Sequence, residues 1–136
     1  MATTPITCHV LDTTTGRPAA GIYVRLSHTQ ASDFEVIFDA YTDNDGRVRA
    51  WAPAQSNHYR TVQEVVELTS VVVRPSGHSA PPMAWSLKFD TGAYFGPGQT
   101  FFPEVEVRFY VTPDSGEHFH VPLLLGPWSY TTYRGS

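Results

Sequence analysis

The chain has 136 residues, a formal net charge of −4, and 41% hydrophobic and 13% aromatic residues. This length and composition fit one packed domain over residues 1–136 rather than a disordered chain. The nine basic residues form no stripe, so nucleic acid is not expected as a partner. No apolar run approaches the ~20 residues that a membrane helix needs, so no membrane association is expected either.

The compartment is predicted from the chain ends and from Cys8, which is the single cysteine. One cysteine excludes an intramolecular disulfide and is compatible with a reducing compartment. Residues Met1–Pro5 lack the charged and then apolar pattern of a secretory signal. The last residues, Arg134–Ser136, differ from the peroxisomal Ser-Lys-Leu signal. We therefore expect a soluble cytoplasmic protein, with a peroxisomal location as the alternative.

The first part of the chain contains short β-rich runs separated by turn residues. Ile6–Leu11 is predicted as a strand, and Ile22–Leu26 alternates apolar and polar residues as a half-buried strand does. Phe34–Tyr41 alternates in the same way and is followed by Thr42–Gly46, a strong turn signal. Arg47–Trp51 is predicted as a further short strand directly after this turn.

Residues 52–82 form the least regular part of the sequence, and we interpret them as a surface insertion. Within them, Thr61–Ser70 places apolar residues at helical spacing but is rich in β-branched residues, which leaves helix and strand equally open. Pro75–Pro82 has the composition of a loop.

The second part of the chain adds a short helix and the clearest strands. Asp90 is predicted to cap a short helix at Thr91–Phe95. Seven or eight short strands with one short helix indicate an all-β fold, a two-sheet antiparallel β-sandwich. The strands predicted here are Trp85–Phe89, Glu104–Val111, His118–Leu125 and Trp128–Tyr133.

Strand geometry sorts the residues that could carry chemistry. Neighbouring strand residues point to opposite faces, so Cys8 and His9 do not share a site, and Cys8 is expected to be a small buried residue. His118 and His120 lie two apart and should share a face. A polar ring among apolar neighbours, as at His120, needs a hydrogen-bond partner or a function.

No single one of these residues is decisive. Taken alone, His9 and His120 are each typical of structural histidines, and Arg47 is typical of a solvated surface arginine. Together the three could form a hydrolytic site, because a neutral imidazole can take a proton from water and a guanidinium can bind carbonyl oxygens. The alternative is a three-histidine zinc site made of His9, His118 and His120.

Six segments in order resemble the transthyretin and hydroxyisourate hydrolase family. They cover nearly the whole chain outside residues 52–82, and the last of them, Tyr-Arg-Gly-Ser, marks the hydrolase branch. Phe119 stands where the family often has tyrosine, and the 52–82 insertion is longer than the family leads us to expect. The segments are Ile6–Ala19, Thr42–Arg47, Phe89–Phe95, Phe101–Glu104, His118–Leu124 and Tyr133–Ser136.

The resemblance implies a transthyretin-like (prealbumin-like) sandwich of two four-stranded sheets, assembled as a homotetramer with active sites in clefts between dimers. It also implies hydrolysis of 5-hydroxyisourate, a purine-derived product of urate oxidation, to 2-oxo-4-hydroxy-4-carboxy-5-ureidoimidazoline (OHCU), with no metal or cofactor. A non-catalytic small-ligand carrier on the same fold is the rival, although the carrier branch lacks the histidines and the Tyr-Arg-Gly-Ser end.

The resemblance further implies the site residues. His9, Arg47 and His120 would be catalytic, with one imidazole activating water, the other protonating the leaving nitrogen, and the arginine stabilising the oxyanion. Because a chain terminus is normally frayed, a tail that lines the site must be held by a partner subunit or by a paired strand. The substrate-binding positions of that tail would be Tyr133, Arg134, Gly135 and Ser136.

Overall fold

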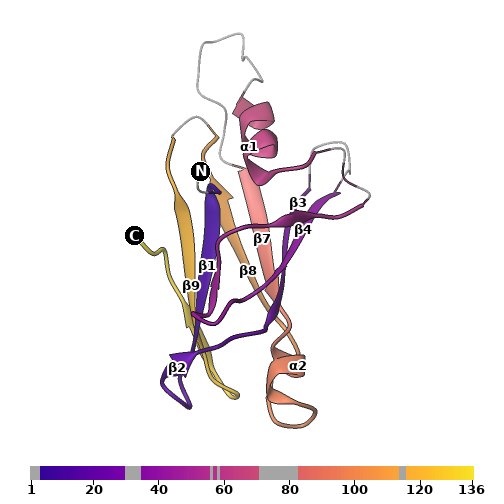
Figure 1. Cartoon of the computed structure of the whole chain (residues 1–136). Coiled ribbons are helices and arrows are strands. Elements are labelled where there is room, and N and C mark those ends of the chain that lie inside the picture. Colours follow the sequence, from indigo (N-terminus) through magenta and orange to yellow (C-terminus); the bar gives the residue numbers. More distant parts are fainter. Residues whose placement is uncertain (1–3, 30–34, 56, 58, 71–82, 114–115) are drawn as a thin grey trace.

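Two β-sheets pack face to face because each strand places its apolar residues on one side (Figure 1). The computed structural model describes residues 4–29, 35–55, 57, 59–70, 83–113 and 116–136. Of the predicted strand Phe34–Tyr41, the first residue lies outside the described residues. The predicted loop Pro75–Pro82 lies wholly outside them.

The first sheet carries the candidate site. Its strands run in the order β10-β9-β1-β2, and β5 also pairs with β1. The pairing of β1 with β9 is parallel, whereas its other pairs are antiparallel. The strands are β1 (Ile6–Asp12), β2 (Arg17–Pro18), β5 (Arg47–Val48), β9 (Phe119–Leu125) and β10 (Tyr130–Thr132).

The second sheet is antiparallel throughout. Its strands run in the order β6-β4-β3-β7-β8. The two sheets confirm the predicted all-β sandwich. Two details of the prediction are wrong: each sheet has five strands rather than four, because the short strands β2, β5 and β6 extend the sheets, and the pairing of β1 with β9 is parallel rather than antiparallel. The strands are β3 (Tyr23–Thr29), β4 (Glu35–Tyr41), β6 (Ala52–Pro53), β7 (Met83–Phe89) and β8 (Val105–Val111).

The inner faces of the sheets form one hydrophobic core. Full burial of each large apolar side chain contributes about 1.5–3 kcal/mol, so this core is the main source of stability. Cys8 belongs to it and is fully buried, as predicted. Burial also raises the pKa of its thiol to about 12, so Cys8 is not a nucleophile at neutral pH. The largest fully buried side chains of the core include Trp85, Phe38, Phe89, Ile6 and Leu26.

Two helices lie at the ends of the sandwich. The predicted helix at Thr91–Phe95 is α2, and the Asp90 side chain caps it by accepting a hydrogen bond from the Ala93 N–H at 3.2 Å. The segment left open between helix and strand is a helix, α1 (Val62–Ser70), whose three valines at positions 62, 65 and 66 are buried in the core. Part of the 52–82 region therefore belongs to the core rather than only to the surface.

The strand predicted at Arg47–Trp51 is shorter than expected. It ends at Val48, because the chain then crosses to the other sheet, where β6 begins at Ala52. Trp51 secures this crossing, since its indole Nε1–H donates to the carbonyl of Ile6 at 2.8 Å.

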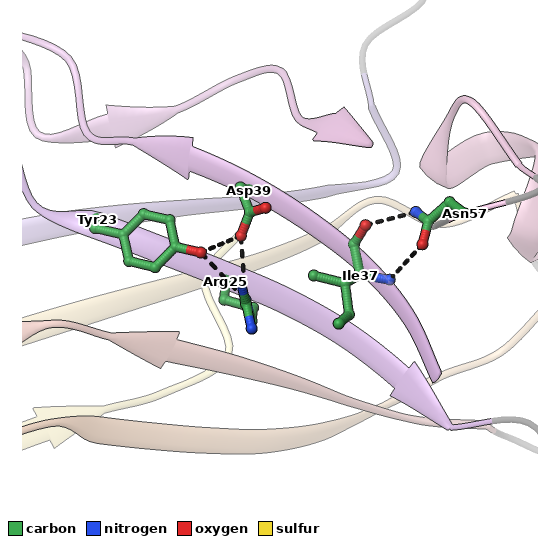
Figure 2. Close-up of polar contacts among 5 residues, drawn as sticks. All are labelled: Tyr23, Arg25, Ile37, Asp39 and Asn57. Carbon is green, nitrogen blue, oxygen red and sulfur yellow. Dashed lines mark hydrogen bonds and ion pairs between the residues drawn. The ribbon is translucent and has the colours of Figure 1, made fainter. Parts of the chain in front are cut away.

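The outer face of the second sheet carries a closed polar network (Figure 2). The Tyr23 hydroxyl donates to Asp39, and Arg25 Nε donates to the same tyrosine oxygen at 3.1 Å and to Asp39 Oδ1 at 3.2 Å. Nearby, the Asn57 amide pairs with both backbone groups of Ile37, so it satisfies part of β4 in the manner of a neighbouring strand. Among the described residues, no helix has the length and apolar character needed to cross a membrane.

Candidate active site

Strand register brings the predicted catalytic residues together on the outer face of the first sheet. His9 of β1 lies directly opposite Arg47 of β5, and Thr7 of β1 lies directly opposite His120 of β9. Directly paired residues point to the same side of a sheet, and so do residues two apart on one strand. The four side chains therefore share the face that the buried Cys8 points away from.

A tight turn sets the position of Arg47. Gly46 adopts a φ of +73°, and a Cβ at this residue would lie 2.4 Å from the carbonyl oxygen of Val10, so only glycine fits. The Asp43 carboxylate accepts hydrogen bonds from the backbone N–H groups of Asp45 and Arg47, both at 2.9 Å. These bonds, led by the one from Arg47, lower the pKa of Asp43 and keep the turn closed at neutral pH.

The two predicted catalytic histidines lie close to each other and to the arginine. The ring centroids of His9 and His120 are 6.4 Å apart. Partial burial, followed by the positive charge of Arg47, lowers the pKa of both rings. For His9, a weaker opposing effect comes from hydrogen bonding to the Asp45 backbone. Both imidazoles are therefore held in the neutral form that can accept a proton at physiological pH.

Thr7 is a residue of this face that the sequence interpretation did not select. Its hydroxyl oxygen lies 2.8 Å from His118 Nε2 and 2.8 Å from His120 Nδ1, and its side chain is buried. His118 and His120 do share a face, as predicted, with ring centroids 6.3 Å apart. The available signal was the position of Thr7, two residues before His9 on the same strand.

The C-terminal tail lies against His120 of its own chain. The Gly135 N–H donates to the carbonyl of His120 at 2.9 Å, which continues the antiparallel register of β10 with β9. The strand is interrupted opposite Pro122, which has no N–H to donate. A Cβ on Gly135 would lie 2.6 Å from His120 Cδ2, so the missing side chain is what allows this close contact.

The remaining tail residues divide between two sides of the sheet. Arg134 lies over the ring of Phe119, with its guanidinium carbon 5.1 Å from the ring centroid, and it pairs with Glu117 at 3.6 Å. It is thus on the opposite side from His120, because it alternates with Gly135 along the strand. Tyr133 and Ser136 are exposed, and Tyr133 alternates onto the histidine side.

A cavity of about 280 Å³ lies between the edges of the two sheets, where β8 and the tail face each other. Its lining includes His120, Tyr133 and Arg134, but neither His9 nor Arg47. His9, Arg47 and His120 are each partly exposed, so the face that they share is accessible to solvent in the single chain.

The geometry does not favour the three-histidine zinc site. Within the described part of the chain, no three His, Cys, Asp or Glu side chains gather closely enough to hold a metal ion. His118 and His120 each direct one ring nitrogen to Thr7 instead. What the face offers chemically is two neutral imidazoles beside one guanidinium, a set that can move protons and stabilise a developing oxyanion.

Comparisons with known proteins agree with this fold and with the resemblance seen in the sequence. The chain is 40% identical over 136 residues to the 5-hydroxyisourate hydrolase of Mus musculus, with 97% of this chain and 95% of the mouse protein covered. It is 34% identical to the 5-hydroxyisourate hydrolase of Deinococcus radiodurans, with 96% and 95% covered.

Solved structures give the same architecture. The 5-hydroxyisourate hydrolase of Klebsiella pneumoniae superposes with a TM-score of 0.60 at 26% identity, covering 99% of this chain and 100% of that one. Sea bream transthyretin superposes with a TM-score of 0.67 at 24% identity, covering 96% and 94%, and this likeness concerns the fold alone. The model of the HIUase/Transthyretin family matches residues 6–135, and the chain belongs to that family.

Proposed function

We propose that this protein hydrolyses 5-hydroxyisourate to OHCU in urate degradation. The relatives named for this activity cover nearly the whole chain at 33–40% identity. The observation that carries the proposal is the convergence of His9, Arg47 and His120 on one sheet face, with Gly135 of the tail seated against His120. A carrier would not require two histidines whose pKa values are lowered beside an arginine.

The proposed mechanism uses each of these groups once. One imidazole, His9 or His120, takes a proton from water as the water oxygen attacks the ring carbonyl. The carbonyl oxygen becomes negatively charged, and the Arg47 guanidinium stabilises it by hydrogen bonding. The other imidazole then donates its proton to the ring nitrogen as the oxyanion collapses and the carbon–nitrogen bond breaks, and it regains a proton from the imidazolium formed in the first step, so both rings end neutral. Proton transfer of this kind contributes roughly 10²–10⁴-fold to the rate.

Tyr133, Gly135 and Ser136 are assigned to substrate binding within this mechanism. The register supports this role for Gly135 and Tyr133, which lie on the histidine side of the sheet edge. Arg134 lies on the other side in the single chain, so its contact with substrate would require a neighbouring subunit. The tail is held by its own paired strand, β9, which is one of the two arrangements that the sequence suggested.

A homotetramer with sites in clefts between dimers is proposed for the assembled enzyme. Large aromatic side chains are exposed near the free edges of both sheets, including Tyr110, which is 71% exposed on β8, and Tyr130, which is 38% exposed on β10. Another subunit that covers the partly exposed face around His9 and Arg47 would turn it into an enclosed cleft. Light scattering on the purified protein tests this assembly directly.

The activity is tested by mixing the protein with freshly prepared 5-hydroxyisourate and following its ultraviolet absorbance. We expect decay far faster than the spontaneous rate. Decay at the spontaneous rate, together with saturable binding of the same compound, would identify a carrier instead. A parallel assay after chelator treatment and metal analysis separates the metal-independent mechanism from a zinc hydrolase, since the latter would lose its activity.

A further inference from the structure

We infer that Thr7 and His118 together position His120, fixing both the orientation of its ring and which of its nitrogens carries the proton. This inference rests on the proposed function for its catalytic consequence, although not for its structural content. Thr7 lies on β1, directly opposite His120 on β9, so the hydrogen bond between them joins the two parallel strands of the candidate site.

The number of protons available limits how Thr7, His118 and His120 can hydrogen-bond. A threonine hydroxyl has one proton and can donate it to only one acceptor. Two ring nitrogens, His118 Nε2 and His120 Nδ1, each lie 2.8 Å from the Thr7 oxygen. At least one of these nitrogens must therefore carry its own proton and donate to Thr7, because otherwise one short contact would join two acceptors.

The direction of the Thr7 hydroxyl thus determines the chemistry of His120. If Thr7 donates to His118, then Nδ1 of His120 holds the proton, and Nε2 is a lone pair that can act as a base. If Thr7 donates to His120, then a neutral His120 carries its proton on Nε2 and can act as an acid. The two states exclude each other, so His118 influences the protonation of His120 through Thr7.

The contacts of the His120 ring also identify the atom that meets the substrate. Its Nδ1 is occupied by Thr7, and its Cδ2 edge is covered by the tail, where a Cβ on Gly135 would come within 2.6 Å. Nε2 is the polar ring atom left for the reacting molecule. Because Thr7 is only 7% exposed, water cannot readily replace its hydroxyl as the partner of His120 Nδ1.

The test removes the hydroxyl while keeping the shape of the side chain. In Thr7→Val we expect kcat to fall about 10- to 100-fold with little change in KM, as when the partner that orients a functional histidine is lost. Thr7→Ser should restore most of the lost rate. His118→Phe, which keeps a ring but no donor, should cause a smaller loss than Thr7→Val. Thr91→Val is the matched control, since it removes a buried hydroxyl that bonds the carbonyl of Phe102.

Nitrogen-15 NMR of the histidine rings provides a readout that does not depend on activity. We expect His120 in the wild-type protein to show one protonated and one unprotonated nitrogen, and Thr7→Val to shift these signals toward an averaged pair. Unchanged His120 signals in a folded Thr7→Val protein would overturn the inference, and so would a mixture of tautomers in the wild type. An absence of hydrolysis by the wild type would contradict the proposed function, while the spectra would still decide the role of Thr7.

Discussion

The outer faces of the two sheets are both polar, but they are organised in opposite ways. On the second sheet, Arg25 and Tyr23 both direct their polar atoms to Asp39, so the charges are compensated within the network. On the first sheet, His9 and His120 lie beside the positive charge of Arg47, and no salt bridge to Arg47 occurs within the part of the chain that the structure describes.

This difference separates a structural network from a site. Groups that satisfy one another need nothing further, and exposed ion pairs of this kind contribute only about 0–1 kcal/mol. An arginine held next to two neutral histidines is instead prepared for an electron-rich ligand that none of the three side chains supplies. The comparison assigns chemistry to the first sheet, and substitutions on both faces can test that assignment.

The largest effect is expected from His120. Replacement of this residue in His120→Asn removes a group that transfers a proton, so we expect the rate of 5-hydroxyisourate hydrolysis to fall roughly 10²–10⁴-fold. The measurement is the initial rate at saturating substrate, with circular dichroism to verify the fold. A loss of less than about tenfold would assign the proton transfers to other groups.

The next largest effect is expected from Arg47. Removal of its charge in Arg47→Gln should reduce kcat/KM roughly 10²–10³-fold, because the developing oxyanion loses its donor. The positive charge of Arg47 lowers the pKa of both histidines, so its removal should raise these pKa values toward the ordinary range. The acid limb of the pH–rate profile should therefore move to higher pH. A limb that stays in place would show that neither histidine acts as the base.

Gly135→Ala tests the contact between the tail and His120. The added methyl group would lie 2.6 Å from His120 Cδ2 and 2.9 Å from Pro122 Cγ, so either the tail or the ring must move. Small displacements of catalytic groups are costly, and we expect a rate reduction of about 10- to 100-fold with a nearly unchanged melting temperature. Wild-type kinetics in this variant would show that the tail plays no part in catalysis.

The smallest effect is expected on the second sheet. Asp39→Asn disrupts the network with Tyr23 and Arg25, in which the charged side chains of Arg25 and Asp39 are partly exposed. We expect unchanged kinetics and a loss of stability below about 1 kcal/mol, measured by urea denaturation. A clear loss of activity here would mean that both faces take part in function, and the contrast between them would fail.

Local sequence patterns predicted much of this structure. Alternating residues located the long strands, the Asp90 cap located α2, and the two-residue spacing placed His118 and His120 on one face. Val62, Val65 and Val66 have helical spacing, but the β-branched residues around them favour a strand. The burial of these three valines against the core is what stabilises the helix α1.

The features that were missed depend on contacts between distant segments. The two-residue spacing from His9 places Thr7 on the same face, but its contact with His120 arises from the register between β1 and β9, which the local sequence does not encode. The position of Arg134 on the side away from His120 likewise depends on how the tail pairs with β9. The early end of the strand at Val48 reflects a crossing between sheets, which local alternation does not encode.

The parallel pairing of β1 with β9 also bears on how the protein is made. Thr7 and His120 are 113 residues apart in the chain, so β1 must wait until β9 has been synthesised before the two strands can pair. Such long-range pairing slows folding, because the entropy of closing a large loop is lost before the contacts form. Activity should therefore appear only after β9 has been made, and no fragment that stops before β9 should retain a part of it.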